Sequence, residues 1–156
     1  MSYAEKTTVP VEKSKSELKR TIMKYGGSGY EMFETEDKAG VQFKSSDRQI
    51  RILVDFPGPE EFTYTPTGRR RRSKDVALKE YEQEQRRRWR ALILCMKAKF
   101  EIVESGISTF EKEFMPYMVL PDGRTVADHV LPKVTEAYAT GQLPKSMIQL
   151  QLEDQR

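Results

Sequence analysis

The sequence is poor in cysteine and contains no long apolar segment. Cys95 is the only cysteine, so we expect no internal disulfide, and this usage fits a reducing compartment. Residues 1–11 lack the apolar core of a secretory signal. No stretch approaches the roughly 20 apolar residues that span a bilayer. We therefore expect a cytoplasmic protein that makes no contact with a membrane.

Histidine is equally scarce, since His129 is the only one. Metal sites and nucleophile triads usually need a second imidazole or a cysteine close by, and we expect Cys95 to be a buried thiol within the apolar stretch 92–96. The glutamates between positions 101 and 113 fit a solvated helix face better than a cation site. The sequence therefore predicts no catalytic residue, no metal site and no cofactor, and we expect a protein that is not an enzyme.

The length of 156 residues suits one domain, but the composition is lean in apolar residues. Hydrophobic residues make up 37% of the chain and charged residues 33%. We expect a flexible arm at residues 1–13, a single α+β domain at residues 14–144 and a polar tail at residues 145–156. We therefore expect a core of modest size or, alternatively, a core that is completed by self-association.

Hydrophobic periodicity predicts the first half of an α+β fold. Ser14 and Glu17 form a capping-box pattern that would begin an N-terminal helix, and Gly26 and Gly27 would end it. From there to Phe56 the apolar period changes to two, which indicates a three-stranded antiparallel meander with one buried face. The residues expected on that face are Tyr30, Met32, Val41, Phe43, Ile50, Ile52, Val54 and Phe56.

A long central helix is predicted in the second half. Residues 57–72 are rich in proline, glycine and arginine, which indicates a loop rather than a packed element. Ser73 would cap a helix that reaches about Ser105 and ends at Gly106. Its apolar residues recur at gaps of three and four, apart from polar Gln85. They are Leu78, Tyr81, Trp89, Leu92, Met96, Phe100 and Val103.

Short helices are expected at the C-terminal end. Ser108 repeats the capping-box pattern before a short helix that Pro116 disturbs. Residues 120–124 predict a turn within a small hairpin. A final helix would run from about residue 127 to 140, with a kink or restart at Pro132, and Gly141 would end it.

Two basic blocks form the candidate site. Residues 69–99 contain twelve Lys/Arg and four Asp/Glu, although the whole chain has a net charge of only +3. Clustered arginines bind phosphate oxygens through their planar forks and release counterions from a polyanion. The loop block would also lie beside the free N–H groups at the start of the long helix. The predicted contact residues are Arg69, Arg70, Arg71, Arg72, Lys74, Arg86, Arg87 and Arg90.

Three interpretations of these arginines remain open. Nucleic acid bound through its backbone is the leading one, and DNA and RNA, single- or double-stranded, all fit this chemistry. An acidic protein surface is the alternative partner. The third is a solvated face that pairs with Glu80, Glu82 and Glu84. Trp89 falls on the apolar face of the helix, so we expect a core residue rather than a base-stacking platform.

The first half of the long helix also predicts a contact between copies of the chain. A meander of short strands covers about 15–20 Å, less than the roughly 39 Å of the apolar residues. Leu78, Tyr81 and Gln85 lie on the uncovered half, flanked by charges as in helix-pairing faces. We expect a homo-oligomer through these three residues.

Five segments have a distinctive sequence, including Arg88-Trp89-Arg90-Ala91-Leu92 and the run Pro66-Thr67-Gly68 with its four arginines. The others are residues 97–99, 104–111 and 119–126. In these segments the chain resembles a family of small phage and prophage proteins with no assigned activity. The resemblance implies a host cytoplasm and a phage setting. There a small basic protein would serve DNA metabolism as an accessory protein or, in the alternative, inhibit a host defence complex.

Overall fold

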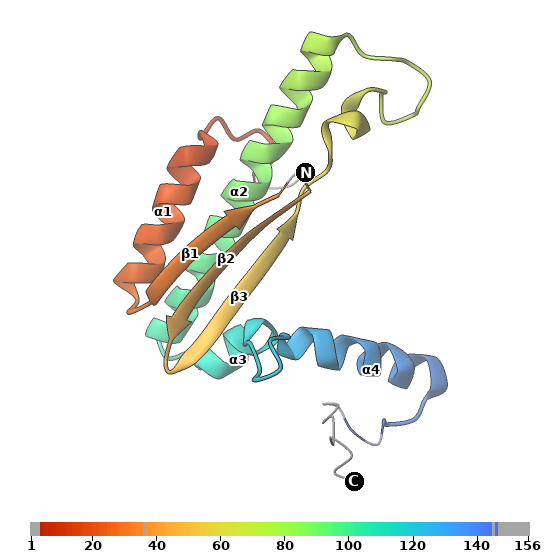
Figure 1. The fold of residues 1–156 in the computed structure, drawn as a ribbon. Helices are drawn as coiled ribbons and strands as arrows, with labels where there is room; N and C mark the ends of the chain where they lie inside the picture. The colour runs from red at the N-terminus through yellow and green to blue at the C-terminus, as the bar shows by residue number, and fades with distance from the viewer. Residues whose placement is uncertain (1–3, 36, 145, 147–156) are drawn as a thin grey trace.

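A three-stranded antiparallel sheet forms one layer of the computed structural model, which describes residues 4–35, 37–144 and 146 (Figure 1). Its strands are β1 (Ser28–Glu34), β2 (Lys38–Ser45) and β3 (Arg48–Asp55), in the order β1-β2-β3. Ser46 and Asp47 both have positive φ, 49° and 59°, as in the tight turns whose twist matches paired strands. The predicted meander is confirmed.

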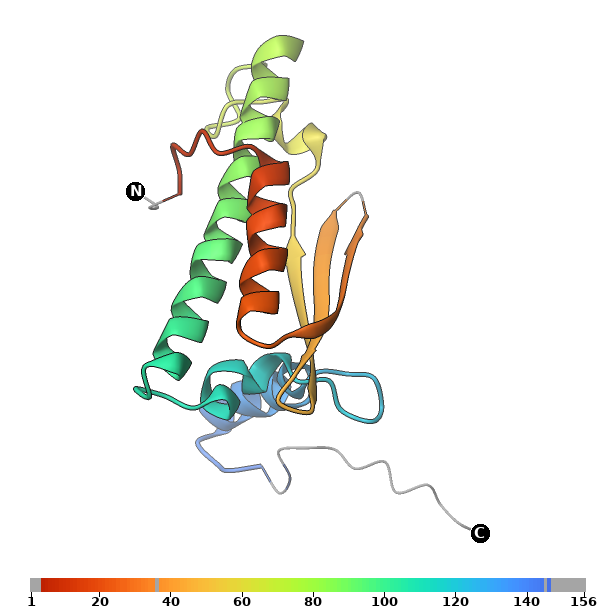
Figure 2. The ribbon, with the colours of Figure 1, turned by 90° about the vertical axis from the view of Figure 1, so that its left-hand side faces the viewer.

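Two helices cover one face of the sheet, and the other face is left open (Figure 2). They are α1 (Val11–Lys24) and the long α2 (Lys74–Glu104). The expected inner residues of β2 and β3 are buried or half-buried, whereas Phe33 and Leu53 on the open face remain 43% and 55% exposed. Alternation along the strands therefore predicted correctly which face is covered.

The core lies between the sheet and α2. Phe100 is its centre, with ring centroids 6.4 Å from Phe43, 5.0 Å from Phe114 and 4.8 Å from Tyr25. Trp89 is 2% exposed, so its prediction as a core residue is confirmed. Ile93, which the expected apolar seam omitted, is fully buried. Burial of each such side chain contributes roughly 1.5–3 kcal/mol.

The start of α1 differs from the prediction. The helix begins at Val11 after Pro10, whose φ of −59° and ψ of 147° suit the residue before a helix. Ser14 is not a cap, because its hydroxyl is buried within the helix without a hydrogen-bond partner. The preceding segment also has fixed contacts, since Ala4 is only 3% exposed. The folded part therefore begins before residue 14.

The loop between β3 and α2 was expected to remain unpacked, and this prediction is wrong. It contains the short helix η1 (Pro59–Phe62), and Phe62 packs edge-on against Tyr81 of α2 at 5.9 Å between ring centroids. Ser73 does cap α2, since its hydroxyl accepts a hydrogen bond from the Val76 amide. Gly106 follows the helix with a φ of 74°, as predicted.

The C-terminal elements begin with α3 (Phe110–Phe114) and η2 (Met115–Tyr117). Thr109, and not Ser108, caps α3, because its hydroxyl accepts the Lys112 amide. The predicted small hairpin is present as a bridge between Val119 and Thr125.

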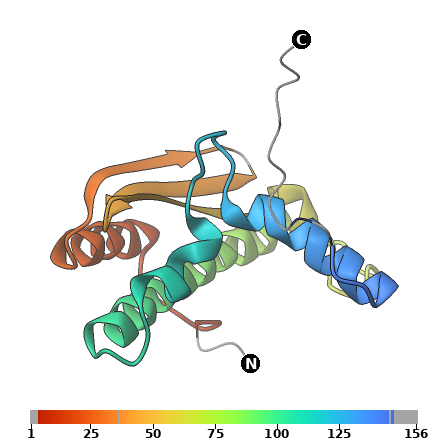
Figure 3. The same cartoon turned by 90° about the horizontal axis from the view of Figure 1, so that it is seen from below.

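The last helix, α4 (Val126–Thr140), extends from the end of the sheet (Figures 1 and 3). It does not restart at Pro132. Proline has no N–H for the carbonyl of Asp128, and the Arg124 guanidinium donates to that carbonyl at 3.0 Å instead. Gly141 ends the helix with a φ of 68°, as predicted. The expected polar tail lies outside the described residues, apart from Ser146.

Candidate nucleic-acid interface

The first arginine block lies on a small hairpin, residues 63–72, which we call the arginine hairpin. Its two sides are joined by hydrogen bonds from the Thr65 amide to the Arg70 carbonyl at 2.8 Å and from the Arg72 amide to the Thr63 carbonyl at 2.8 Å. A β-turn closes it, with the Gly68 amide bonded to the Thr65 carbonyl at 2.7 Å. Gly68 has a φ of 69°, which suits glycine. The arginines are thus held on a defined backbone.

Arg72 serves the hairpin and not a ligand. Its guanidinium donates to the carbonyl oxygens of Phe62 at 3.2 Å and Tyr64 at 2.6 Å. These bonds tie the end of η1 to the base of the hairpin next to α2. Arg72 is therefore a positioning residue, and its prediction as a contact residue finds no support in this geometry.

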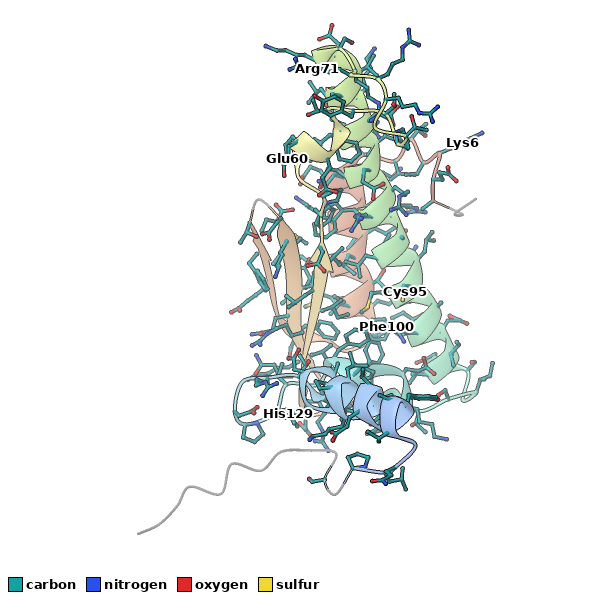
Figure 4. All side chains as sticks on the ribbon, turned by 90° about the vertical axis from the view of Figure 1, so that its right-hand side faces the viewer. Lys6, Glu60, Arg71, Cys95, Phe100 and His129 are labelled. Carbon is teal, nitrogen blue, oxygen red and sulfur yellow. The ribbon has the colours of Figure 1, made fainter. Side chains whose placement is uncertain are left out.

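The other three arginines of the block are exposed. Arg69, Arg70 and Arg71 form no side-chain hydrogen bond or ion pair with any residue that the structure describes. Lys74, at the start of α2, is exposed as well. Figure 4 shows Arg71 at the end of the molecule where α2 begins. These four cations are available to an anionic partner.

Tyr64 is a residue of this surface that the sequence reasoning missed. It pairs with Arg71 across the hairpin, so both side chains lie on the same face of it. The residue is 52% exposed. An exposed tyrosine beside an arginine can stack on a base or enter a protein interface. Its place opposite Arg71 depends on the register of the hairpin, which the sequence pattern did not show.

The second arginine block is largely paired within the protein. Arg87 donates twice to Glu84, and Arg88 donates to the same carboxylate at 2.6 Å and to the Asp55 carbonyl. The Arg87 guanidinium, despite partial burial of the carboxylate, holds the pKa of Glu84 below its usual value, and Arg88 adds to this effect. Arg86 donates to the side-chain oxygen of Gln83 at 3.1 and 2.8 Å.

Arg90 reaches across to α1. It donates to Glu17 at 2.7 Å, and Lys97 binds the other oxygen of the same carboxylate. The bond from Lys97 is the main reason that the pKa of Glu17 is lowered; burial opposes it and Arg90 reinforces it. The predicted site is therefore divided, with free cations on the hairpin and at Lys74, and paired ones further along α2.

Trp89, between these arginines, packs against Phe56 at 5.7 Å between ring centroids. The Lys15 ammonium lies 5.1 Å from the tryptophan ring and pairs with Glu34 at 2.8 Å. Partial burial lowers the pKa of Lys15, but hydrogen bonds to Glu34 and Glu12 outweigh this effect and raise it. The face of the ring nearest α1 is occupied by Lys15, so Trp89 offers no stacking platform there.

The three residues predicted as an interface between copies are in different environments. Leu78 is 56% exposed, whereas η1 partly covers Tyr81 and Gln85 is half-buried. The first half of α2, which was expected to be uncovered, is therefore partly covered. A homo-oligomer through these residues remains a prediction, and Leu78 is its most accessible member.

Two residues were considered for catalysis or metal binding, and the structure places His129 beside the 120–124 turn and Cys95 on the exposed side of α2. His129 is 7% exposed and lies 2.7 Å from Asp122, which joins the 120–124 turn to α4. The Arg124 amide is the main cause that lowers the pKa of Asp122, with the histidine adding to it. Cys95 is exposed and not buried, because it lies on the side of α2 away from the core. Among the described residues, no group of three or more potential ligands could hold a metal ion.

Within the described part of the chain, no helix combines the length and apolar character needed to cross a membrane. No family model matches the sequence. Searches of curated proteins and of solved structures likewise gave no significant match.

Proposed function

We propose that the protein binds nucleic acid without catalysis, through the phosphate backbone. The contact residues are Arg69, Arg70 and Arg71 of the arginine hairpin, together with Lys74 at the start of α2. The observation that carries the proposal is that these four cations are exposed and unpaired among the described residues, whereas Arg87, Arg88 and Arg90 are paired internally.

Physical chemistry supports this choice of partner. A cluster of guanidinium groups on a fixed backbone gains free energy from counterion release when it meets a polyanion. The hairpin limits the backbone entropy lost on binding, because its cross-strand bonds and Arg72 already define its shape. The resemblance to small phage proteins supplies the phage setting of the proposal and none of its residues.

An acidic protein surface is the second candidate partner, and one observation favours it. Tyr64 and Leu78, 52% and 56% exposed, belong to the same end of the molecule as the free arginines. Tyrosine and arginine are enriched among residues that dominate the binding energy of protein interfaces. In this reading the protein would be an interaction module, such as an inhibitor of a host defence complex.

A salt series tests the proposed function. About three to four phosphates neutralised on a duplex predict a slope of log K against log salt of about −3. The triple variant Arg69→Gln, Arg70→Gln and Arg71→Gln should lose most of the affinity and most of this slope, evenly across sequences. Affinity would be measured by fluorescence anisotropy with labelled duplex and single-stranded DNA and RNA.

The matched control removes the same charge elsewhere. Lys38, Lys44 and Lys112 are exposed and lie on other elements, so their triple change to Gln should leave affinity nearly unchanged. Absence of binding to all four nucleic acids would overturn the proposal. Equal losses in the two triple variants would overturn it as well, because they would show that only net charge matters.

A further inference from the structure

A second basic surface lies between α1 and α2, and the sequence reasoning did not find it. The two helices lie side by side and run in the same direction (Figures 1 and 2). A groove of about 880 Å³ opens between them, which we call the α1–α2 groove. Thr21, which is buried, and Ala98, which is exposed, are among the residues that line it.

One wall of the groove is a row of cations on α1. Lys13, Arg20 and Lys24 line it, and their spacing with Glu17 at gaps of four, three and four places them on one helix face. All three cations are exposed. Lys13 and Arg20 form no side-chain hydrogen bond or ion pair with a described residue, and Lys24 lies 5.1 Å from the ring of Tyr25.

The opposite wall comes from α2, which contributes Arg90 and Lys97. Both pair with the carboxylate of Glu17 on α1, so they add positive charge to the groove but are not free cations like those of the α1 row. The second carboxylate of the groove, Glu101, accepts a hydrogen bond from the Tyr25 hydroxyl at 3.3 Å. The groove thus has five cations against two carboxylates, and the three cations without an ion pair to a described residue are Lys13, Arg20 and Lys24.

We infer that the α1–α2 groove holds the backbone of single-stranded nucleic acid, as an extension of the contact made by the arginine hairpin. This inference rests on the proposed function and names the class of nucleic acid. Grooves lined by cations that follow the backbone are a common feature of proteins that bind single strands.

The width and length of the groove favour a single strand over a duplex. Packed helices have axes about 8–10 Å apart, so a rigid duplex would touch only the rims, whereas a single strand can follow the floor. The row from Lys13 to Lys24 contains twelve residues, and its eleven steps of 1.5 Å rise about 16 Å. At about 3.4 Å per phosphate in a stacked strand, this length accommodates roughly five nucleotides.

Base identity should matter little in the groove. Tyr25 is the aromatic residue that lines it, and its ring is stacked on Phe100 at 4.8 Å with Lys24 nearby. With the ring engaged in this way, base stacking on Tyr25 is disfavoured. Recognition in the groove is therefore electrostatic and tolerant of sequence.

The segment before α1 connects the groove with the hairpin. Gln83, which lies on α2 between Lys74 and Arg90, donates to the carbonyls of Glu5 and Thr7 at 3.0 Å each. These bonds hold the segment against α2, and Figure 4 shows Lys6 on this segment, beside α2. From Lys74 to Glu101 the helix rises about 40 Å, so one strand of roughly twelve nucleotides could contact both surfaces.

The test uses the full chain and oligothymidylates of 5, 10, 15 and 20 nucleotides, with a 15-base-pair duplex for comparison. The groove variant is Lys13→Gln, Arg20→Gln and Lys24→Gln, and the control is the triple change to Gln at Lys38, Lys44 and Lys112. For dT15 the groove variant should lose roughly tenfold or more in affinity, and its salt slope should become shallower by about 2, since single strands contribute about 0.7 per phosphate. Its affinity for the duplex should change little.

The outcomes separate this inference from the proposed function. The parent should bind dT15 more tightly than the duplex, and its affinity should stop rising beyond about twelve nucleotides. If the groove variant binds dT15 with unchanged affinity and slope while the triple variant of Arg69, Arg70 and Arg71 loses both, the groove inference is overturned and the proposed function stands. Tighter binding of the duplex than of dT15 by the parent would also overturn the inference. If the parent binds neither, both proposals fail.

Discussion

The guanidinium of Arg87 donates two hydrogen bonds, of 2.6 and 2.5 Å, to the carboxylate of Glu84. The same carboxylate accepts a bond from Arg88, which reaches on to the end of β3. Glu84 therefore pairs with part of the basic run and holds Arg88, which connects α2 with the sheet. Arg87, which the sequence predicted as a contact residue, and its neighbour Arg88 stabilise the fold instead.

The first prediction concerns this connection. Glu84→Gln should lower the free energy of unfolding by about 1–2 kcal/mol, because a neutral amide cannot form charge-assisted bonds to both arginines. Glu80→Gln is the control, since Glu80 is exposed, and its effect should stay within about 0.5 kcal/mol. Urea unfolding followed by circular dichroism measures both. Equal effects of the two variants would contradict a structural role for Glu84.

The second prediction concerns the pH dependence of stability. The pKa values of Glu17 and Glu84 are lowered from 4.5 by their basic partners. A carboxylate with a lower pKa in the folded state stabilises the fold above its unfolded pKa, and this contribution disappears as the pH falls towards the folded pKa. The free energy of unfolding should therefore decrease as the pH is lowered from about 5 to about 3. In the double variant Glu17→Gln and Glu84→Gln this decrease should be clearly shallower, and an unchanged slope would refute the assignment.

The third prediction separates the two roles within the four consecutive arginines. Arg72→Gln should loosen the arginine hairpin, because the carbonyls of Phe62 and Tyr64 lose their shared donor. The lost hydrogen bonds contribute about 1–1.5 kcal/mol. Hydrogen exchange at the backbone amides of positions 65 and 72 should therefore become roughly tenfold faster. Arg69→Gln should leave both exchange rates unchanged. Exchange read out by NMR decides between them, and similar rates in the two variants would remove the positioning role of Arg72.

The fourth prediction concerns the turn after α1. A Cβ on Gly27 would lie 2.4 Å from the Ile22 Cγ2 atom and 2.8 Å from the Ile22 carbonyl oxygen. Because the second contact is with backbone, Gly27→Ala should cost about 1–3 kcal/mol. A Cβ on Gly26 would have no atom within 4 Å. Gly26→Ala therefore costs only the strain of the positive φ of 82°, about 1 kcal/mol. Thermal unfolding of the two variants should show the larger loss for Gly27, and the reverse order would contradict this packing.

Local patterns predicted most of the fold. Period-two alternation identified the covered sheet face. Ser73 and Gly106 marked the two ends of α2, because each of these signals acts on residues only a few positions away. The same local patterns misplaced two helix starts. A Ser-x-x-Glu pattern can also occur inside a helix, as at Ser14, and neighbouring Ser108 and Thr109 offer the same hydroxyl.

The candidate site was predictable only in part. The composition of the arginine hairpin was visible in the sequence, but the fate of each guanidinium was not. Arg90 meets Glu17 across 73 positions of the chain, and this distance is bridged only when α1 and α2 pack together. The α1–α2 groove was missed for the same reason. Its cations on α1 are spaced as on any solvated helix, and only the neighbouring helix makes them one wall of a groove.

The position of α2 after the sheet has a consequence for biosynthesis. The buried face of the meander is complete once Phe56 has been made, but Trp89, Met96 and Phe100, which cover it, follow some 30 to 45 positions later. At about 5–20 residues per second the ribosome needs roughly 2–9 s to add them. During that interval Val41, Phe43 and Ile50 have no cover from α2. The nascent chain is therefore most prone to aggregation, and most in need of a chaperone, between the synthesis of β3 and the completion of α2.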